Sequence, residues 1–227
     1  MKFFKKLFLI IVLIIIVGIS IVGFIGYNYY QKALEEKSLS DRVLEVQENK
    51  DFVKYEDLSQ TYINAVIAVE DHRFYNHGAV DFISIGRALY TNIREKELKE
   101  GGSTITQQVA KNVCFSQEQN LLRKSAEIFA AIDLEKNYSK NEIFELYVNT
   151  SYFGNGYYGI GQASLGYYNK KPSELNLDEA TMLAGVPNAP SVYAPTKNPD
   201  LAKQRQQQVL RKMVKYEYIT QEDADSI

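Results

Sequence analysis

The longest apolar run of the chain lies at its N-terminus, where residues 7–26 contain no charged side chain. A helix needs about 20 consecutive apolar residues to cross a bilayer, so the run predicts one transmembrane segment. Three lysines precede it, and the positive-inside rule then places residues 1–6 in the cytoplasm and the rest of the chain outside. A cleaved signal peptide is the alternative, but the run exceeds a typical h-region and no small-x-small cleavage site follows.

Beyond the apolar run, residues 27–57 mix charged side chains with short apolar stretches. This pattern predicts a connecting segment with one short strand near residues 42–46, followed by a single domain over residues 58–227. Ser59 is the predicted N-cap of the first helix of that domain. Its apolar residues recur at i, i+3 and i+4, and the helix is expected to end at Glu70.

Helical spacing recurs through the rest of the chain, and few runs alternate with period two. The sequence therefore predicts a mainly α domain, with further helices over residues 82–92, 121–138, 139–147, 176–185 and 198–216, and one more beginning at Thr220. Residues spaced for burial in these helices are Phe82, Ile85 and Leu89; Leu121, Ser125, Ile128, Phe129 and Ile132; Leu201, Val209, Met213 and Tyr216. The face of 82–92 is expected to lie in the core, and contact with lipid is the alternative.

The glycines at 154, 156 and 159 spell G-x-G-x-x-G, the pattern of a dinucleotide-binding turn. That fingerprint requires a preceding strand, whereas here a capped helix comes first, with Ser139 and Glu142 as a capping box. The sequence predicts a loop shaped by glycines instead. The chain ends just after the helix start at Thr220, which favours further sequence downstream.

Composition narrows the choice of function. The chain has 227 residues, of which 45% are hydrophobic and 24% charged, enough for one domain with a core. A net charge of -2 and a pI near 5.8 do not favour nucleic acid as a partner. A single cysteine excludes an internal disulfide, and with only two histidines a structural zinc site is disfavoured.

The first candidate for chemistry is Glu70, which takes the i+7 place on the apolar stripe of its helix and is followed by Asp71. Burial disfavours the charged form of a carboxyl group, and proteins use this to prepare a glutamate for proton exchange near neutral pH. The alternative is that both carboxylates end the helix and face solvent.

A second candidate is the polar stretch that follows Gly101 and Gly102. It gathers uncharged hydrogen-bonding side chains ahead of a lysine, namely Ser103, Thr104, Thr106, Gln107, Gln108 and Lys111. Such a set suits a ligand with many oxygens, such as a sugar or a phosphate. It is equally typical of a helix cap followed by a polar helix face. The glycines and charges of residues 94–118 also predict that this segment is mobile without ligand.

A third candidate is the trio of Arg123, Lys124 and Glu127, which cluster on one side of a predicted helix. One interpretation is a surface ion pair of little energetic consequence. The other is a pair of cations that neutralises a phosphate, with a carboxylate that orients them or holds a divalent cation.

Four stretches in this order resemble the peptidoglycan glycosyltransferase family, which includes monofunctional transglycosylases and the N-terminal domains of bifunctional penicillin-binding proteins. They are EDHRFYNHG from Glu70, GGSTITQQVAKN from Gly101, RKSAE from Arg123 and KNEIFELYVNTSYFGNGYYGIGQAS from Lys140. The resemblance covers residues 55–215. It implies a mainly α, lysozyme-like glycosyltransferase domain with a small membrane-proximal lobe, preceded by one transmembrane helix, and a transpeptidase domain could follow.

The resemblance also implies a reaction and roles for residues. The enzyme would polymerise lipid II into β-1,4-linked glycan strands with inversion, releasing undecaprenyl pyrophosphate. Glu70 would be the general base and Glu127 the second essential glutamate, a possible ligand of a divalent cation (Mg or Mn). The implied substrate-binding residues are Asp71, Phe74, His77, Ser103, Thr104, Gln107, Gln108, Lys111, Arg123 and Lys124.

The implied setting is a bacterial cell membrane, with a single membrane pass and an extracytoplasmic catalytic domain. The expected partners are lipid II, the growing glycan strand, membrane lipid and proteins of cell-wall synthesis or division, with no nucleic acid. Two other functions compete with the polymerase: a lysozyme-like enzyme that cleaves glycan, and a membrane-tethered cell-wall scaffold without catalysis. A hydrolase needs a general acid but no cluster of cations for a pyrophosphate, so the basic residues favour the polymerase.

Overall fold

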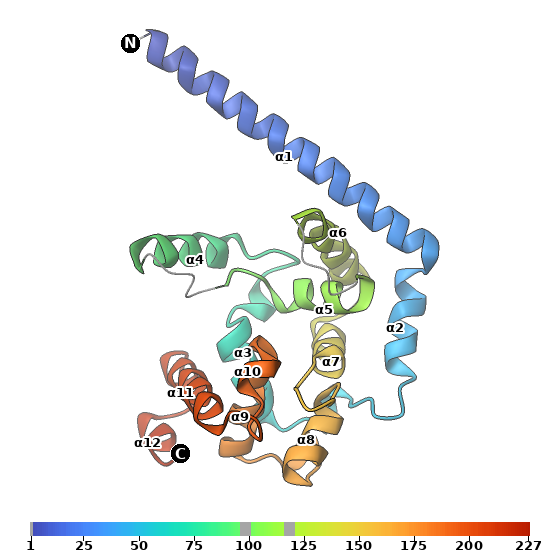
Figure 1. Cartoon of the computed structure of the whole chain (residues 1–227), viewed down its shortest axis with the longest axis vertical. Coiled ribbons are helices and arrows are strands. Elements are labelled where there is room, and N and C mark those ends of the chain that lie inside the picture. Colours follow the sequence, from blue (N-terminus) through green and yellow to red (C-terminus); the bar gives the residue numbers. More distant parts are fainter. Residues whose placement is uncertain (1, 96–100, 116–120) are drawn as a thin grey trace.

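The structure is a computed structural model, and it describes residues 2–95, 101–115 and 121–227. It confirms the mainly α prediction: in the described residues the β structure consists of one isolated bridge between Tyr152 and Tyr158. A long N-terminal helix leans over a bundle of shorter helices (Figure 1). The α-helices are α1 (Lys2–Glu36), α2 (Leu39–Gln47), α3 (Gln60–Glu70), α4 (Phe82–Glu95), α5 (Ile105–Cys114), α6 (Leu121–Asn137), α7 (Lys140–Thr150), α8 (Ile160–Tyr168), α9 (Leu177–Gly185), α10 (Pro190–Tyr193), α11 (Pro199–Lys215) and α12 (Gln221–Asp225).

Helix α1 contains the predicted transmembrane segment and continues past it to Glu36 without a break. It is long and apolar enough to cross a membrane, with an 18-residue window of mean hydropathy 3.3 that has no buried residue. Its C-terminal part lies against α6, where the Tyr30 hydroxyl donates to Asp133 Oδ2 at 3.1 Å. One end of the anchor is therefore packed on the domain, and the other extends free of it.

Residues 42–46 form part of helix α2, so the predicted strand is wrong. Ser38 caps this helix by accepting from the Asp41 amide at 3.1 Å. Leu39, Val43 and Val46 share the inner face at i, i+4 and i+7, a helical spacing within a mostly polar stretch. The Arg42 guanidinium donates to the carbonyl oxygens of Ala33, Lys37 and Val113, which ties α2 to the end of α1 and to α5.

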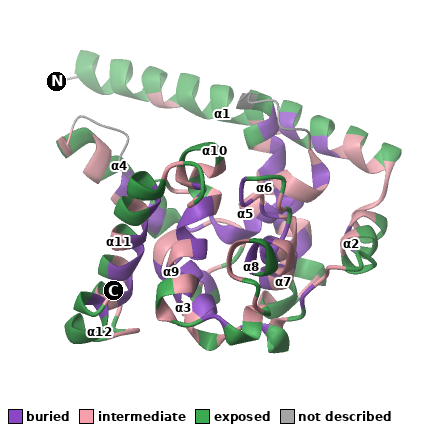
Figure 2. Cartoon of the chain, turned by 60° about the horizontal axis from the view of Figure 1, so that its bottom comes forward, coloured by how far each residue is buried: buried purple, intermediate pink, exposed green. Residues whose placement is uncertain are grey.

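The core lies between α3, α5, α7, α9 and α11, where buried residues concentrate (Figure 2). Helix α3 contacts α9 and α11, and α5 contacts α6 and α7. The prediction for α3 is confirmed: Ser59 caps it by accepting from the Tyr62 amide, and it ends at Glu70. The capping boxes of α7 at Ser139 and of α12 at Thr220 are also present.

The predicted burial of α4 is wrong. Phe82 is 79% exposed and Leu89 60%, and Ile85 is 40% exposed, while Ser84 and Ala88 are the buried residues of this helix. Helix α4 therefore turns its small and polar face toward the protein and its apolar face outward. Amphipathic spacing shows that a helix has an apolar side, but it does not say what that side meets.

The predicted inner stripe of α6 is displaced. Its fully buried apolar residues are Ala126, Ala130, Ala131 and Leu134, whereas Ser125, Ile128, Phe129 and Ile132 are only partly buried. The side chain of Leu121 lies outside the described residues. The displacement arises because α6 packs on two sides: small residues face the core near α5, and larger ones such as Phe129 meet α1, where its ring lies 5.5 Å from that of Tyr27. Leu201 of α11 is likewise 40% exposed, contrary to prediction.

The glycine-rich segment is a loop, as predicted. Gly154, Gly156 and Gly159 all have φ near +80°, a region that favours glycine. At Gly159 an added Cβ would also lie 3.0 Å from the Asn149 carbonyl oxygen. The loop therefore turns tightly against the end of α7.

Two polar residues of α7 hold the segment that leads into the domain. Glu145 accepts from the Tyr55 amide at 2.7 Å. The Asn149 side chain accepts from the Val53 amide and donates to the Val53 carbonyl oxygen, both at 2.8 Å. Asn149 thus acts in the way a neighbouring β-strand would, satisfying both backbone groups of one residue.

We predict that Asn149→Ala destabilises the protein, because it leaves both backbone groups of the buried residue Val53 without their partner. The expected loss is about 2 kcal/mol, or roughly 4–8 °C in Tm for a domain of this size. Thermal unfolding in detergent measures it. Asn141→Ala, at an exposed position of the same helix, is the control and should change Tm by no more than about 1 °C; equal shifts in both variants would contradict the proposed role.

Candidate active site

A cleft of about 880 Å³ opens between the C-terminal end of α3 and helices α4, α5, α6 and α11. It brings together all the predicted site residues except Phe74 and His77. Those that line it are Glu70, Asp71, Ser103, Thr104, Gln107, Gln108, Lys111, Arg123, Lys124 and Glu127. The three candidate stretches of the sequence thus converge on one cavity.

Glu70 is the last residue of α3, and its side chain is 10% exposed. Gln108 Nε2 donates to one of its carboxylate oxygens at 2.9 Å. Arg205 Nη2 lies 3.5 Å from the other, at the edge of hydrogen-bond distance. The carboxylate is held from two sides, by α5 and α11, while it lines an open cleft. A group in this position can accept a proton from a bound hydroxyl.

Glu127 forms the centre of a second cluster in the cleft. Its side chain is 1% exposed, with Lys124 Nζ at 2.8 Å from one carboxylate oxygen and Arg123 Nε at 3.1 Å from the other. Lys124 also donates to Ser103 Oγ at 3.0 Å. Burial lowers the pKa of nearby Lys111, the positive charges of Arg123 and Lys124 lower it further, and the carboxylate of Glu127 opposes them. Three cations around one carboxylate leave an excess of positive charge for an anionic ligand.

The N-terminus of α5 is both a helix cap and a wall of the cleft. Thr104 Oγ1 accepts from the Gln107 amide and Gln107 Oε1 accepts from the Thr104 amide, each at 3.1 Å. The capping interpretation of the polar stretch is therefore correct for these two residues. Ser103, Gln108 and Lys111 keep polar atoms directed at the cleft and its charged groups.

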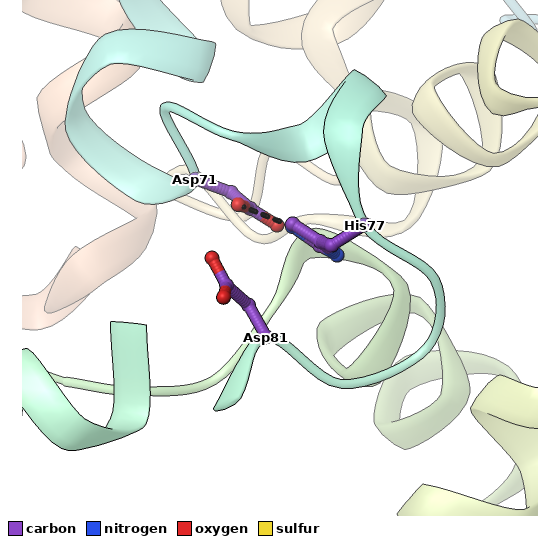
Figure 3. A group of neighbouring side chains, drawn as sticks. All are labelled: Asp71, His77 and Asp81. Atoms are coloured by element: carbon purple, nitrogen blue, oxygen red, sulfur yellow. Dashed lines mark hydrogen bonds and ion pairs between the residues drawn. The ribbon is translucent and has the colours of Figure 1, made fainter. Parts of the chain in front are cut away.

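Asp71 and Asp81 line the cleft, and His77 lies behind them, with one atom of each within 4.8 Å of the others (Figure 3). The His77 ring places Nε2 at 2.7 Å from Asp71 and Nδ1 at 2.6 Å from the Gly78 carbonyl oxygen. Burial lowers the pKa of His77, but these two hydrogen bonds and the Asp71 charge outweigh it, so the net shift is upward. Asp71 in turn accepts from the Ile105 amide at 3.1 Å, which links the end of α3 to the start of α5.

The side chain of Phe74 packs into the core and holds this turn in place. It is fully buried, with its ring 6.2 Å from that of Phe144 and Lys140 Nζ 4.5 Å from its centre. Phe74 and His77 therefore shape the loop that carries Asp71 and do not line the cleft. The family resemblance implied that both bind substrate, and the structure does not place either of them in the cleft.

The donor sets do not suit a divalent cation. Both carboxylate oxygens of Glu127 face cationic side chains. In the other cluster, Asp81 accepts from Ser84 and from amides of α4, and Arg73 Nε lies 3.0 Å from it. Burial raises the pKa of Asp81, but these hydrogen bonds and the Arg73 charge bring it down to about 2. A metal would have to displace a cation at either place.

Sequence reasoning missed the wall formed by α11. Arg205, Gln208, Lys212 and Lys215 recur at i, i+3, i+7 and i+10 and line the cleft together with Arg211. The sequence shows this helical spacing, but it does not show which part of the protein the polar face lies against.

His72 and Arg87 were also missed as lining residues of the cleft. The His72 ring stacks on Tyr216 with centroids 4.2 Å apart, and Arg87 Nη1 lies 3.2 Å from His72 Nε2. Burial and the Arg87 charge lower the pKa of His72.

The predicted mobility of residues 94–118 falls in part on 96–100 and 116–118, which lie outside the described residues.

Comparison with known proteins gives one consistent result. Residues 36–214 match the family model described as Transglycosylase. The chain is 38% identical to Penicillin-binding protein 1F of Bacillus subtilis over 97% of its own length and 33% of that protein. It is 43% identical to Penicillin-binding protein 1A of Neisseria gonorrhoeae over 79% of its length and 22% of that protein. The chain thus spans a third or less of these relatives.

Among solved structures, a crystal structure of Penicillin-binding protein 1A from Haemophilus influenzae is similar over 54% of this chain and 15% of that one. The identity is 29% and the TM-score 0.37.

We predict that the bonds of His77 stabilise the fold in a pH-dependent way. Its pKa in the folded protein is raised above the ordinary value of 6.5, so its charged form stabilises the fold fully below pH 6.5, and this contribution is lost as pH rises through the raised pKa. The Tm difference between the parent and His77→Gln should therefore be larger at pH 5.5 than at pH 9. A difference that stays constant or grows with pH would contradict the assignment.

Proposed function

Because this chain belongs to the transglycosylase family, we propose that it polymerises lipid II into β-1,4-linked glycan strands and releases undecaprenyl pyrophosphate. The observation that carries the proposal is that one cleft contains two separate groups of residues suited to two different tasks. Glu70 stands on one side, held by an amide and an arginine, and the cations around Glu127 form a separate group. A glycosyl transfer to a hydroxyl, with a pyrophosphate as leaving group, requires both parts.

In the proposed reaction the 4-hydroxyl of the acceptor sugar gives its proton to Glu70 while its oxygen attacks the anomeric carbon of the growing strand. The new bond forms on the face opposite the leaving group, so the configuration inverts. The bond from the anomeric carbon to the phosphate oxygen breaks, and its electron pair leaves with the pyrophosphate. Gln108 and Arg205 orient the Glu70 carboxylate for this step.

The leaving pyrophosphate gains negative charge as its bond to the sugar breaks. Lys111, Arg123 and Lys124 are the groups that stabilise this charge, with the Ser103 hydroxyl beside Lys124 as a neutral partner. Cations fixed in place before the reaction stabilise a transition state more than mobile ones, because nothing needs to reorganise. Glu127 holds two of them by ion pairs of 2.8 and 3.1 Å.

A polymerase must hold two substrates, and each carries a lipid-linked pyrophosphate. The cleft has a second basic wall, which can bind the second pyrophosphate. It consists of Arg211, Lys212 and Lys215 of α11 and Arg87 of α4. We assign the acceptor lipid II to this wall and the growing strand to the cations around Glu127. Arg205 lies between the two, next to Glu70.

A divalent cation (Mg or Mn) remains an expectation from the family resemblance. The carboxylates of Glu70 and Glu127 face cationic side chains, and in the proposed reaction protein side chains carry the proton transfer and the charge stabilisation. A cation that arrives with the substrate pyrophosphate is compatible with this scheme.

Two alternatives make different predictions. A glycan-cleaving enzyme would shorten strands and would have no use for two basic walls. A non-catalytic scaffold would bind glycan or proteins of cell-wall synthesis or division without any dependence on Glu70. Both are tested by the same assay as the polymerase.

Two apolar surfaces support a membrane setting. Helix α1 is long and apolar enough to be the anchor. Helix α4 lies on the same side of the domain as the N-terminal part of α1 (Figures 1 and 2), and its exposed apolar residues are Phe82, Ile83, Leu89, Tyr90 and Ile93. We propose that this face contacts the outer leaflet of the bacterial cell membrane and that the cleft, which α4 borders, opens to lipid-linked substrate outside the cytoplasm.

We predict that Glu70→Gln abolishes polymerisation of labelled lipid II by the detergent-purified protein, with products resolved by size. The amide cannot accept the proton, and loss of a general base costs about 10²–10⁴-fold in rate. Glu56→Gln, at a side chain that is 77% exposed, is the control and should retain parent activity. Long strands from both variants would leave the reaction standing but remove Glu70 as its base; if the parent instead shortens strands, the polymerase proposal is wrong.

We also predict that α4 contacts lipid. A fluorophore on a cysteine introduced at Leu89 should be quenched by vesicle lipids with brominated acyl chains, and one at Gln221 of α12 should not. The native Cys114 is buried, which raises the pKa of its thiol to about 11, so it should not take the label. Equal quenching at both sites, or none at either, would refute the membrane contact.

A further inference from the structure

Helix α1 packs against the helix that carries the Glu127 cluster. Ser125, which lies between Lys124 and Ala126, donates through its hydroxyl to the Val22 carbonyl oxygen of α1 at 3.0 Å. Farther along the same contact, Tyr27 meets Phe129, and Tyr30 donates to Asp133. The contact therefore runs along α6 from its first turns to its last.

At Gly26 the two helices approach each other closely. A Cβ atom added there would lie 2.2 Å from Ser125 Oγ, 2.5 Å from Ser125 Cβ and 2.9 Å from the Ser125 carbonyl carbon. Rotation of the serine side chain could clear the first contact but not the other two. The other glycines of α1, Gly18 and Gly23, have nothing within 4 Å of an added Cβ. The close approach thus depends on the absence of a side chain at one position.

Helix α6 has little room to yield on its other side. Ala126, Ala130 and Ala131 are fully buried in the core, where α5 contacts α6. A push from α1 would therefore shift α6 as a body or separate it from α1. Arg123, Lys124 and Glu127 are in the same two turns as Ser125, so a shift of α6 changes their positions relative to Lys111 of α5.

We infer that Gly26 and Ser125 are positioning residues, through which the membrane anchor sets the place of Arg123, Lys124 and Glu127 in the cleft. The inference rests on the proposed function for its catalytic consequence, and on geometry alone for the positioning. In this arrangement the anchor contacts one side of α6 and fixes its position, in addition to holding the domain at the membrane. Neither residue lines the cleft.

The test compares one substitution at three positions of the same helix, in the full chain in detergent: Gly26→Ala, Gly23→Ala and Gly18→Ala. A shift of about 1 Å in catalytic groups can cost up to about 100-fold in rate. We expect Gly26→Ala to lower kcat by about 10- to 100-fold, because the shifted cations act on charge that develops in the transition state. The KM for lipid II as acceptor should change little, because the acceptor is assigned to the basic wall of α11. The other two variants should stay within about twofold of the parent.

Adding Ser125→Gly to Gly26→Ala removes two of the three close atoms and should recover at least about threefold of the lost rate. Amide hydrogen exchange gives a readout independent of catalysis: residues 123–130 should exchange faster in Gly26→Ala than in Gly23→Ala, with α9 and α11 unchanged. Equal behaviour of the three alanine variants in exchange overturns the positioning role. If exchange differs but the rates do not, α1 positions α6 without consequence for catalysis, and the inference fails in that part. A parent that does not polymerise lipid II overturns the proposed function and the catalytic consequence, while exchange still decides the positioning.

Discussion

The cleft depends on one buried negative charge. Lys111, Arg123 and Lys124 repel one another, and side chains of like charge do not converge in a partly buried site without compensation. The Glu127 carboxylate, 1% exposed, supplies that compensation through its contacts with Arg123 and Lys124. Burying it is costly, and the ion pairs with Arg123 and Lys124 within α6 offset part of that cost. Contact between α5 and α6 brings the third cation, Lys111, within range of the same carboxylate. The position of α6 between α5 and α1 is thus the structural condition for a cationic site at this place.

Local signals predicted much of the fold. The apolar run of α1 is continuous in the sequence. The N-cap at Ser59 and the capping boxes at Ser139 and Thr220 each depend on residues within one helical turn of one another, so the sequence shows all of these features directly. The convergence of Glu70, Gln108 and Glu127 followed from the family resemblance and not from any spacing, because these residues come from three helices. Cap and ligand roles also proved compatible, since Thr104 and Gln107 form the cap while Ser103 and Gln108 reach the charged groups.

The errors share a physical cause. The outward face of α4, the displaced stripe of α6 and the basic row of α11 each depend on what lies opposite the helix. A periodic pattern states which residues share a side, but a core, a neighbouring helix and a bilayer are all apolar surroundings. Helix α6 has two apolar sides, one in contact with α5 and one in contact with α1. A prediction that assumed a single buried side therefore placed the buried residues wrongly. The prediction of a strand near Arg42 was wrong because the stretch is short and Ser38 just before it is a helix N-cap.

Helix α1 has 35 residues without a break, and a turn of two residues, 37–38, separates its end at Glu36 from the start of α2 at Leu39. At 1.5 Å per residue it measures about 52 Å, against about 30 Å for the hydrocarbon layer. Its exit from the bilayer is stiff, and Arg42 ties the following turn to the carbonyl oxygens of Ala33 and Lys37. The domain is therefore joined to α1 by a short, bonded turn and not by a flexible linker, so that the direction in which the cleft opens is coupled to the orientation of α1.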